Sequence, residues 1–254
     1  MQEITSPPQG VHESEEFWDR FTASASIHPG NLYRYTLISN LIEQISGTKQ
    51  SILDIGCGNG ALLAHFKNRF IGSNYIGIDG SAAIIERNRR TQSFAQFQQG
   101  DLQDPKRFAD FPLVDVVTCS EVVEHMPDYA PAFRIAHTCL RPGGYFILTT
   151  QGGKRRRHDI ELLGHLRHYN IDELAKEVSE AGFDIIKKQQ AGFPALTIQK
   201  IAASMFIGQV SKELASHAEP SLFFKFACKL IGFGLAVSST RYGPQLVILA
   251  KKKG

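Results

Sequence analysis

Cysteine is scarce in this 254-residue sequence and is not arranged for disulfides or a metal cluster. The four cysteines lie far apart without a C-x-x-C pair, at Cys57, Cys119, Cys139 and Cys228. Three of them fall in apolar stretches, where a thiol packs as a small hydrophobic group. We therefore expect reduced cysteines, a cytoplasmic location and a core that needs no disulfide or structural metal.

Long apolar runs and a strong net charge are missing too. No run of about 18 uncharged apolar residues occurs, so we expect no transmembrane helix. The polar, acidic N-terminus lacks the features of a secretory signal peptide. Lys and Arg number 28 against 25 Asp and Glu, a balance too even to indicate nucleic-acid binding by itself. Basic residues do cluster at Lys154–Arg157 and Lys251–Lys253.

Apolar strand patterns alternate with helical patterns through most of the chain. The expected strands are 51–55, 75–78, 95–98, 114–119, 145–149, 183–188 and 246–250. The expected helices are 31–45, 61–70, 82–90, 131–140 and 171–181. This alternation predicts right-handed βαβ units, hence an α/β fold with a parallel sheet covered on both faces.

Three regions are expected. Residues 1–48 form an N-terminal arm and helices, with residues 1–14 flexible, aromatic residues at Phe17-Trp18 and Gly47 ending a helix. Residues 49–192 and 241–254 form the α/β domain. Residues 193–240 are more than a minimal sheet needs, and we expect a helical insertion or lid there. Asn170 is the expected N-cap of helix 171–181, and Gly182 its end.

The glycine-rich turn Gly56-Cys57-Gly58-Asn59-Gly60 follows the first strand. Glycines at a strand end allow a tight turn and a close approach to a ligand. The spacing is G-x-G-x-G, and Asp54 precedes it. A carboxylate here would repel the diphosphate of a dinucleotide but favours the cationic amino group of a sulfonium amino acid. Asp54, Gly56, Cys57 and Gly58 therefore predict S-adenosylmethionine rather than NAD.

Two further carboxylates follow the next two strands. Asp79, with Gly80, ends the second strand 23 residues after Gly56, where a carboxylate accepts hydrogen bonds from ribose hydroxyls. Asp101, with Leu102, follows the third strand, where it would meet the adenine amino group. The alternatives are a helix N-cap for Asp79 and a plain turn residue for Asp101.

Ser120-Glu121-Val122-Val123-Glu124-His125 follows the fourth strand. On a helix, Glu121, Glu124 and His125 share one face, because they stand at i, i+3 and i+4. Two carboxylates and an imidazole suit Mg²⁺ or Mn²⁺. The alternatives leave the metal out: Glu121 contacts the methionine amino group or stabilises the helix N-terminus, and His125 packs or transfers a proton.

These motifs resemble those of class I S-adenosylmethionine-dependent methyltransferases. The resemblance spans residues 31 to about 190 and is carried by LDIGCGNG, IGIDGS, GDL, DVVTCSEVVEHM and LRPGGYFILTT. It implies a Rossmann-like seven-stranded sheet, mostly parallel with an antiparallel last strand.

Within this class, DVVTCSEVVEHM is most similar to the ubiquinone-pathway O-methyltransferases, which methylate phenolic and catechol hydroxyls of prenylated rings. The E-x-x-E-H pattern also resembles the small-RNA 3′-end 2′-O-methyltransferases. Both groups use the motif with a divalent metal. Carried over to this chain, Ser120 joins the cofactor positions and Arg34 holds the methionine carboxylate, unless Arg34 is a solvated helix residue. The RNA enzymes use a downstream histidine as fourth ligand, which leaves His158, His165 and His168 open.

Two features of the second half bear on the acceptor. One is a loop that we expect over the sulfonium and that contains His165, Arg167, His168 and Tyr169. These residues would supply an acceptor contact, a base or a metal ligand. The alternative is a surface loop with polar residues and no such role. Segment 221–233 is apolar with edge lysines, as in an amphipathic helix that covers a pocket or lies on a membrane; core or dimer packing is the alternative.

We therefore expect an S-adenosylmethionine-dependent enzyme that O-methylates a small or lipid-like molecule, with Glu121, Glu124, His125, His165 and His168 as catalytic candidates. Alternatives are methylation of an RNA 2′-hydroxyl, supported only by Lys154–Arg157, or of a nitrogen or carbon atom. A cofactor-binding protein without turnover and a nicotinamide oxidoreductase are alternatives of other classes. The sequence leaves the oligomeric state open.

Overall fold

The computed structural model describes residues 28–45, 50–208 and 222–254, with side chains from residue 228 onward in the last range. The expected arm at residues 1–14, Phe17-Trp18 and Gly47 lie outside the described residues. The apolar block 221–233 is described only in part.

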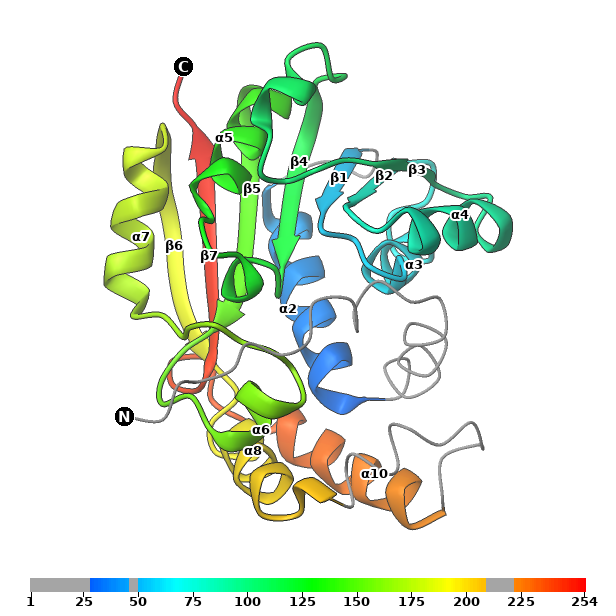
Figure 1. The fold of residues 1–254 in the computed structure, drawn as a ribbon. Helices are drawn as coiled ribbons and strands as arrows, with labels where there is room; N and C mark the ends of the chain where they lie inside the picture. The colour runs from blue at the N-terminus through cyan, green and yellow to red at the C-terminus, as the bar shows by residue number, and fades with distance from the viewer. Residues whose placement is uncertain (1–27, 46–49, 209–221) are drawn as a thin grey trace.

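Seven strands form one sheet in the order β3-β2-β1-β4-β5-β7-β6. The strands are β1 Ser51–Ile55, β2 Asn74–Asp79, β3 Gln96–Gln99, β4 Val114–Ser120, β5 Leu140–Gln151, β6 Phe183–Ala191 and β7 Gln245–Lys252. The pairs from β3 to β5 are parallel, whereas β7 runs antiparallel to both β5 and β6. The expected sheet, mostly parallel with an antiparallel last strand, is confirmed (Figure 1).

The central strands are buried on both faces, as their unbroken apolar patterns predict. Pairing places Leu53, Val117 and Phe146 in one row across β1, β4 and β5, and these three side chains belong to one buried cluster. Their neighbours Ile52 and Val116 belong to the cluster on the opposite face. Successive residues of a strand point to opposite faces, so both faces carry a core.

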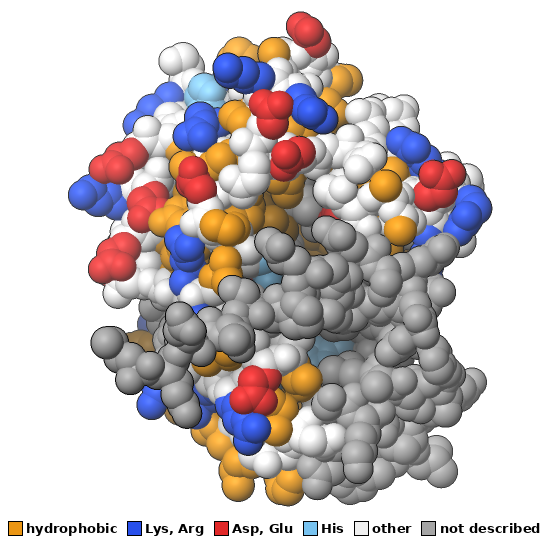
Figure 2. Space-filling view, in the orientation of Figure 1, with side chains coloured by type: hydrophobic (Ala, Val, Ile, Leu, Met, Phe, Trp, Pro, Cys, Tyr) orange, Lys and Arg blue, Asp and Glu red, His pale blue; other side chains and the backbone are white. Residues whose placement is uncertain are grey.

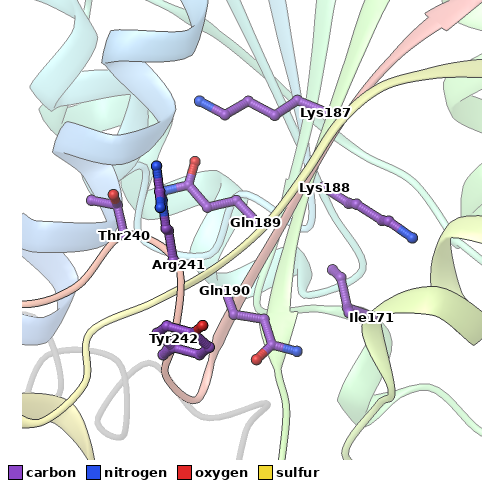
Figure 3. A pocket seen from close by; sticks show the side chains of 8 residues that line it. All are labelled: Ile171, Lys187, Lys188, Gln189, Gln190, Thr240, Arg241 and Tyr242. Carbon is purple, nitrogen blue, oxygen red and sulfur yellow. The ribbon is translucent and has the colours of Figure 1, made fainter.

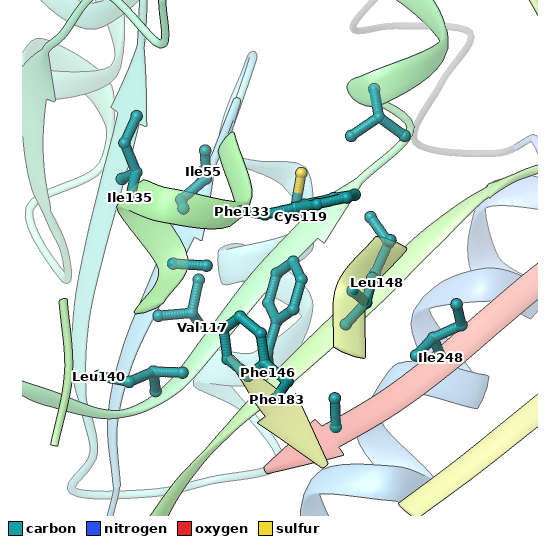
Figure 4. Close-up of a cluster of buried hydrophobic side chains, with 14 of the residues drawn as sticks. Ile55, Val117, Cys119, Phe133, Ile135, Leu140, Phe146, Leu148, Phe183 and Ile248 are labelled. Carbon is teal, nitrogen blue, oxygen red and sulfur yellow. The ribbon is translucent and has the colours of Figure 1, made fainter. Parts of the chain in front are cut away.

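Helices cover each face of the sheet. The helices are α2 Pro29–Ile45, α3 Ala61–Lys67, α4 Ala82–Thr91, α5 Ala130–Cys139, α6 Arg157–Glu161, α7 Ile171–Glu180, α8 Ala195–Met205 and α10 Leu222–Ala236, with 3₁₀ turns η2 Pro105–Phe108 and η3 Val123–His125. Side chains of α5 and α7 pack into the cluster around Phe146, Phe183 and Ile248 (Figure 4). Side chains of α2, α3 and α4 pack into the other.

Local signals set most helix ends. Asn170 caps α7, since its side-chain oxygen accepts hydrogen bonds from the backbone of Asp172 and Glu173, and Gly182 follows it with a left-handed φ of 99°. Both predictions are confirmed. Strand β5 begins at Leu140 and runs through Pro142-Gly143-Gly144, five residues before the expected start. The register shift between Val114 and Val116 of β4 accommodates this extension.

The described part of the segment between β6 and β7 contains the helices α8 and α10. Helix α10 packs against α2 and α8, and α8 packs against the short helix α6. Figure 1 shows α6, α8 and α10 together below the lower ends of the central strands. Among the helices of the described residues, none has both the length and the apolarity to span a bilayer.

Candidate active site

The glycine-rich turn lies at the carboxyl end of β1 and is tied to β2. Gly56, Gly58 and Gly60 have φ values of 71°, 49° and 73°, a left-handed region that glycine enters without strain. The backbone N–H groups of Gly56 and Cys57 both donate to the carbonyl of Ile78, at 2.8 and 2.9 Å. The turn is therefore a rigid, close-packed backbone at a strand end, where open α/β sheets bind ligands.

Gly56 also leaves no room for a side chain. A Cβ atom there would lie 2.4 Å from Cγ2 of Val122, in the segment that follows β4. The cofactor turn and the segment that carries Glu121 and Glu124 are thus in direct contact.

Asp79 organises the backbone between the first two strands. Its carboxylate accepts hydrogen bonds from the N–H groups of Gly58 at 2.9 Å and Ser81 at 3.0 Å. Burial raises the pKa of Asp79, and these backbone donors oppose the rise. Ser81, not Asp79, is the N-cap of α4. The role of Asp79 toward ribose stays a prediction.

A cavity of about 370 Å³ lies beside Asp79. It is lined by Gly80, Gln99, Gly100, Asp101 and Arg107. The Asp101 side chain is exposed and accepts a hydrogen bond from the backbone of Gln103 at 2.9 Å. The adjacent Leu102 packs against the core. Asp101 thus lines this cavity, while its hydrogen bond with Gln103 is the one that a turn residue makes; contact with adenine stays a prediction.

Asp54 is buried below the turn, with 3% of its surface exposed. Its carboxyl accepts a hydrogen bond from the hydroxyl of Thr118 at 2.7 Å. Burial raises the pKa of Asp54 to about 7, although the Thr118 hydrogen bond opposes the rise. Asp54 therefore titrates near neutrality, and a cationic ligand nearby would favour its charged form.

Arg34 of α2 reaches the carboxyl end of β4. Its Nε donates to the Ser120 hydroxyl at 3.0 Å, and its Nη1 lies 3.9 Å from Oε2 of Glu121. The two predicted cofactor residues Arg34 and Ser120 are thus brought together. The guanidinium lies at the end of β4, within reach of a ligand carboxylate.

Glu121 does not share a helix face with Glu124 and His125, and that prediction is wrong. Glu121 has a φ of 56°, and only Val123–His125 form a 3₁₀ turn. The side-chain amides of Gln151 and Gln245 donate to the Glu121 carboxylate. Burial raises its pKa, but Arg34 and the two glutamines outweigh burial and hold the pKa below its usual range. Glu121 is a charged partner of Arg34, on the cofactor side.

Glu124 is fully buried, and one of its oxygens lacks a partner among the described residues. Oε2 accepts a hydrogen bond from Thr150 at 2.8 Å, whereas Oε1 has no hydrogen bond. Burial, with a contribution from Glu121, raises the pKa of Glu124 well above its usual value. A buried carboxylate oxygen without a donor is costly unless a ligand meets it.

His165 completes a cluster with Glu124 and His125. Each of the three offers one ligand atom, and these atoms lie within 4.8 Å of one another. The loop that contains His165 is held next to Glu124, because the backbone N–H of Leu166 donates to the Glu124 carbonyl at 2.8 Å. Of the three downstream histidines left open by the sequence, the structure brings His165 to the Glu124–His125 pair.

Asp159, Lys200 and His168 form a second polar group next to His165, and the sequence analysis did not predict it. Asp159 of α6 is fully buried; Lys200 of α8 lies 3.1 Å from its Oδ1 and His168 lies 3.8 Å from its Oδ2. Lys200 also donates to Gln151 at 2.8 Å. Burial raises the pKa of Asp159, but Lys200 and the Arg156 N–H outweigh it and lower that pKa. No local pattern marks these partners, which come from segments far apart in the sequence.

The comparisons with known proteins agree with this geometry. A family profile described as "Methyltransferase domain" matches residues 31–188. The chain belongs to the methyltransferase domain family. The cofactor implied by this family, S-adenosylmethionine, is the one that the sequence predicts.

The curated relatives of this methyltransferase domain include ubiquinone biosynthesis O-methyltransferases. The protein of that name from Pseudomonas aeruginosa strain UCBPP-PA14 is 33% identical over 155 residues, which cover 59% of this chain and 64% of the relative. That from Acinetobacter baylyi is 24% identical over 208 residues, covering 73% and 85%. The chain thus spans just under two thirds of the length of the Pseudomonas relative.

Solved structures share the fold at low identity. An S-adenosylmethionine-dependent methyltransferase from Mesorhizobium loti has a TM-score of 0.52 and 17% identity, covering 87% of this chain and 98% of its own. The [4+2]-cyclase SpnF has a TM-score of 0.55 and 17% identity, covering 85% and 80%. A cyclase among these neighbours shows that the fold does not by itself define the reaction.

A larger hollow of the methyltransferase domain lies away from this site. About 540 Å³ in volume, it lies along the edge strand β6 and is lined by Ile171, Lys187, Lys188, Gln189, Gln190, Thr240, Arg241 and Tyr242 (Figure 3). It contains none of the predicted site residues, and Lys188 is paired with Asp172.

The basic run Lys154–Arg157 has partners within the protein. Arg155 donates to the carbonyls of His165 and Leu166, and Arg157 pairs with Glu161 at 2.7 Å. Part of this run therefore stabilises the His165 loop, which weakens the support for an RNA acceptor.

Proposed function

We propose that this protein O-methylates a hydroxyl of a small or lipid-like molecule, with S-adenosylmethionine as methyl donor. The observation that supports it most is buried Glu124, which has one oxygen without a hydrogen bond and offers a ligand atom within 4.8 Å of those of His125 and His165. The relatives named ubiquinone biosynthesis O-methyltransferase support the same class of acceptor.

Glu124, His125 and His165 fit a divalent cation. One carboxylate and two imidazoles, within 4.8 Å of one another, suit Mn²⁺ or Fe²⁺ better than Mg²⁺, which prefers oxygen ligands alone. Such a cation lowers the pKa of an acceptor hydroxyl and orients it.

Methyl transfer is an in-line displacement in which positioning dominates. The acceptor oxygen forms a bond to the methyl carbon, the carbon–sulfur bond breaks, and its electron pair stays on the sulfur of S-adenosylhomocysteine. Arg34 would hold the methionine carboxylate and Asp79 the ribose, and the cluster with Glu124 would receive the acceptor hydroxyl. If the cluster holds no cation, the exposed His125 accepts the hydroxyl proton. If it holds one, the cation would lower the pKa of the hydroxyl and the proton leaves to water.

Calorimetric titration of Mn²⁺ into protein saturated with S-adenosylhomocysteine tests the cation site. We expect saturable binding in the wild type, loss in Glu124→Ala, and retention in Glu121→Gln, which instead weakens cofactor binding because Arg34 loses its charged partner. Absence of binding in the wild type would remove the cation from the proposal. Loss in Glu121→Gln as well as in Glu124→Ala would restore the ligand set expected from the sequence.

The insertion supports a lipid-like acceptor. On α8, Ile198, Ile201 and Met205 are exposed at helical spacing, and Leu230 and Phe233 of α10 are exposed likewise. Hydrophobic side chains gather at the lower end of the molecule, where α8 lies (Figure 2). The exposed cations Lys229 and Arg241 lie in sequence on either side of Phe233. Apolar side chains with nearby cations suit an anionic lipid surface.

Sedimentation with phosphatidylglycerol vesicles tests this surface. Phe233→Asp should reduce binding at least fivefold, whereas Ile71→Asp, an equally exposed position in the loop after α3, should not. Equal binding by both variants and the wild type would show that α10 does not contact the vesicle.

A further inference from the structure

The rings of His165 and His168 share a single hydrogen bond. Nδ1 of His165 lies 3.1 Å from Nε2 of His168, and the ring centroids are 5.3 Å apart. One of the two nitrogens must carry the proton and the other must accept it. The direction of this bond decides which nitrogen of His165 has a lone pair.

A backbone carbonyl settles the direction. Nδ1 of His168 lies 3.3 Å from the carbonyl oxygen of Gly153, which only accepts, so Nδ1 of His168 carries a proton. In the neutral ring, Nε2 then has the lone pair and accepts from Nδ1–H of His165. The second nitrogen of His165, Nε2, is left as the unprotonated one.

The surroundings hold both rings in place. His165 is 5% exposed, and the side chain of His168 is 3% exposed. Asp159, 3.8 Å from Nε2 of His168, is paired with Lys200 at 3.1 Å. The backbone N–H of Tyr169 donates to the Gln151 carbonyl at 2.9 Å, which fixes the His168 segment beside Gly153.

We propose that His168 is a positioning residue: held by the Gly153 carbonyl, it fixes His165 as the Nδ1–H tautomer and so leaves the Nε2 lone pair as the one that His165 can offer to the cluster with Glu124 and His125. This inference rests on the proposed function, and it explains how a buried imidazole presents a lone pair to a cation or an acceptor proton. Hydrogen bonds behind a ligand of this kind typically change metal affinity 10- to 100-fold.

Two substitutions separate positioning from simple packing. His168→Phe keeps an aromatic ring of similar size but removes the acceptor. His168→Gln keeps an acceptor oxygen near the position of Nε2. If His168 only fills space, Phe is the milder change. If it accepts from His165, Gln is the milder one.

The readout is the tautomer of His165, measured on the full chain with ¹⁵N-labelled histidine by long-range ¹H–¹⁵N NMR. We expect the Nδ1–H tautomer in the wild type and in His168→Gln, and a mixture in His168→Phe. An Nε2–H tautomer in the wild type, or no change in His168→Phe, would overturn the proposal. This readout needs neither a metal nor a methyl acceptor, so it stands apart from a failure of the proposed function.

Mn²⁺ titration of the same variants gives the functional consequence. Affinity should fall 10- to 100-fold in His168→Phe and stay within about threefold of the wild type in His168→Gln, with S-adenosylhomocysteine affinity unchanged in both. Complete loss of Mn²⁺ binding in both variants would overturn the proposal, because it would show that His168 is itself a ligand. Asp159, His165 and His168 would then be the ligand set, since their ligand atoms also lie within 4.8 Å of one another.

Discussion

Asp54 lies under the cofactor turn with its carboxyl hydrogen-bonded to Thr118 and almost no contact with solvent. Its pKa is about 7 in the folded protein, whereas the ordinary pKa of an aspartic acid is 3.8. Because the folded state prefers the protonated form, the protein is most stable below pH 4 with respect to this group. That contribution is lost as the pH rises to about 7.

Asp54→Asn should remove this dependence while keeping an oxygen that accepts from Thr118. The difference in free energy of unfolding between Asp54→Asn and the wild type should grow from pH 4 to pH 8 by an amount on the order of 4 kcal/mol. Urea unfolding of both proteins at several pH values measures it, since other titrating groups cancel. A difference that stays constant with pH would contradict the raised pKa.

Gly56 is the position where one added carbon should weaken cofactor binding most directly. In Gly56→Ala, the methyl group would lie 2.4 Å from Cγ2 of Val122, so the turn and the segment after β4 must move apart. We expect at least a tenfold loss of S-adenosylhomocysteine affinity by calorimetry.

Gly143→Ala is the matched control for Gly56→Ala. Its φ is 72° and the nearest atom, Cε of Lys251, is 3.5 Å from the added carbon. Both variants should lose about 1 kcal/mol of stability from left-handed strain, and Gly56→Ala should lose more because its methyl group also meets Val122; only Gly56→Ala should lose affinity. Equal affinities would mean that the contact between the turn and Val122 is unimportant for binding.

Among the elements, the central strands were predictable because the apolar pattern that determines them lies within each strand's own sequence. Successive residues such as Val116 and Val117 both had to be apolar, because they point to opposite faces of a strand that is buried on both. The segment after β4 was not predictable, because distant residues override its helical spacing. Gln151 and Gln245 lie 30 and 124 residues from Glu121 in the sequence, and their amides hold its carboxylate.

Helices α6 and α8 are joined by the buried pair of Asp159 and Lys200. Removing one partner of such a pair leaves a buried charge, at a cost of about 3 kcal/mol. We expect Lys200→Met to lower the free energy of unfolding by about this amount, and the double variant Lys200→Met/Asp159→Asn to recover at least half of it. Chemical unfolding of the single and double variants measures the coupling.

The exposed pair of Arg157 and Glu161 on α6 serves as the control for that cycle. Its side chains are 66% and 48% exposed, and Arg157→Met should change stability by less than about 1 kcal/mol. If the changes from Lys200→Met and Asp159→Asn simply add, the two residues do not interact and the proposed link between α6 and α8 is wrong.

Over the whole molecule, the insertion between β6 and β7 reaches back to elements that carry site residues. Helix α10 packs against α2, which carries Arg34, and α8 packs against α6, which carries Asp159. The sequence predicted a helical insertion from its length and apolar blocks. It did not predict that Lys200 would enter the site, because one lysine in an apolar helix has no local signature.

The most direct test of the central claim is methyl transfer itself. The protein is incubated with Mn²⁺, methyl-labelled S-adenosylmethionine and a prenylated catechol. The products are then separated, identified and quantified by mass spectrometry. We predict equal amounts of S-adenosylhomocysteine and of a catechol methylated on oxygen, with both lost in Glu124→Ala. Transfer of the label to nitrogen or carbon acceptors only, or undiminished transfer by Glu124→Ala, would contradict the assignment of this site to hydroxyl methylation.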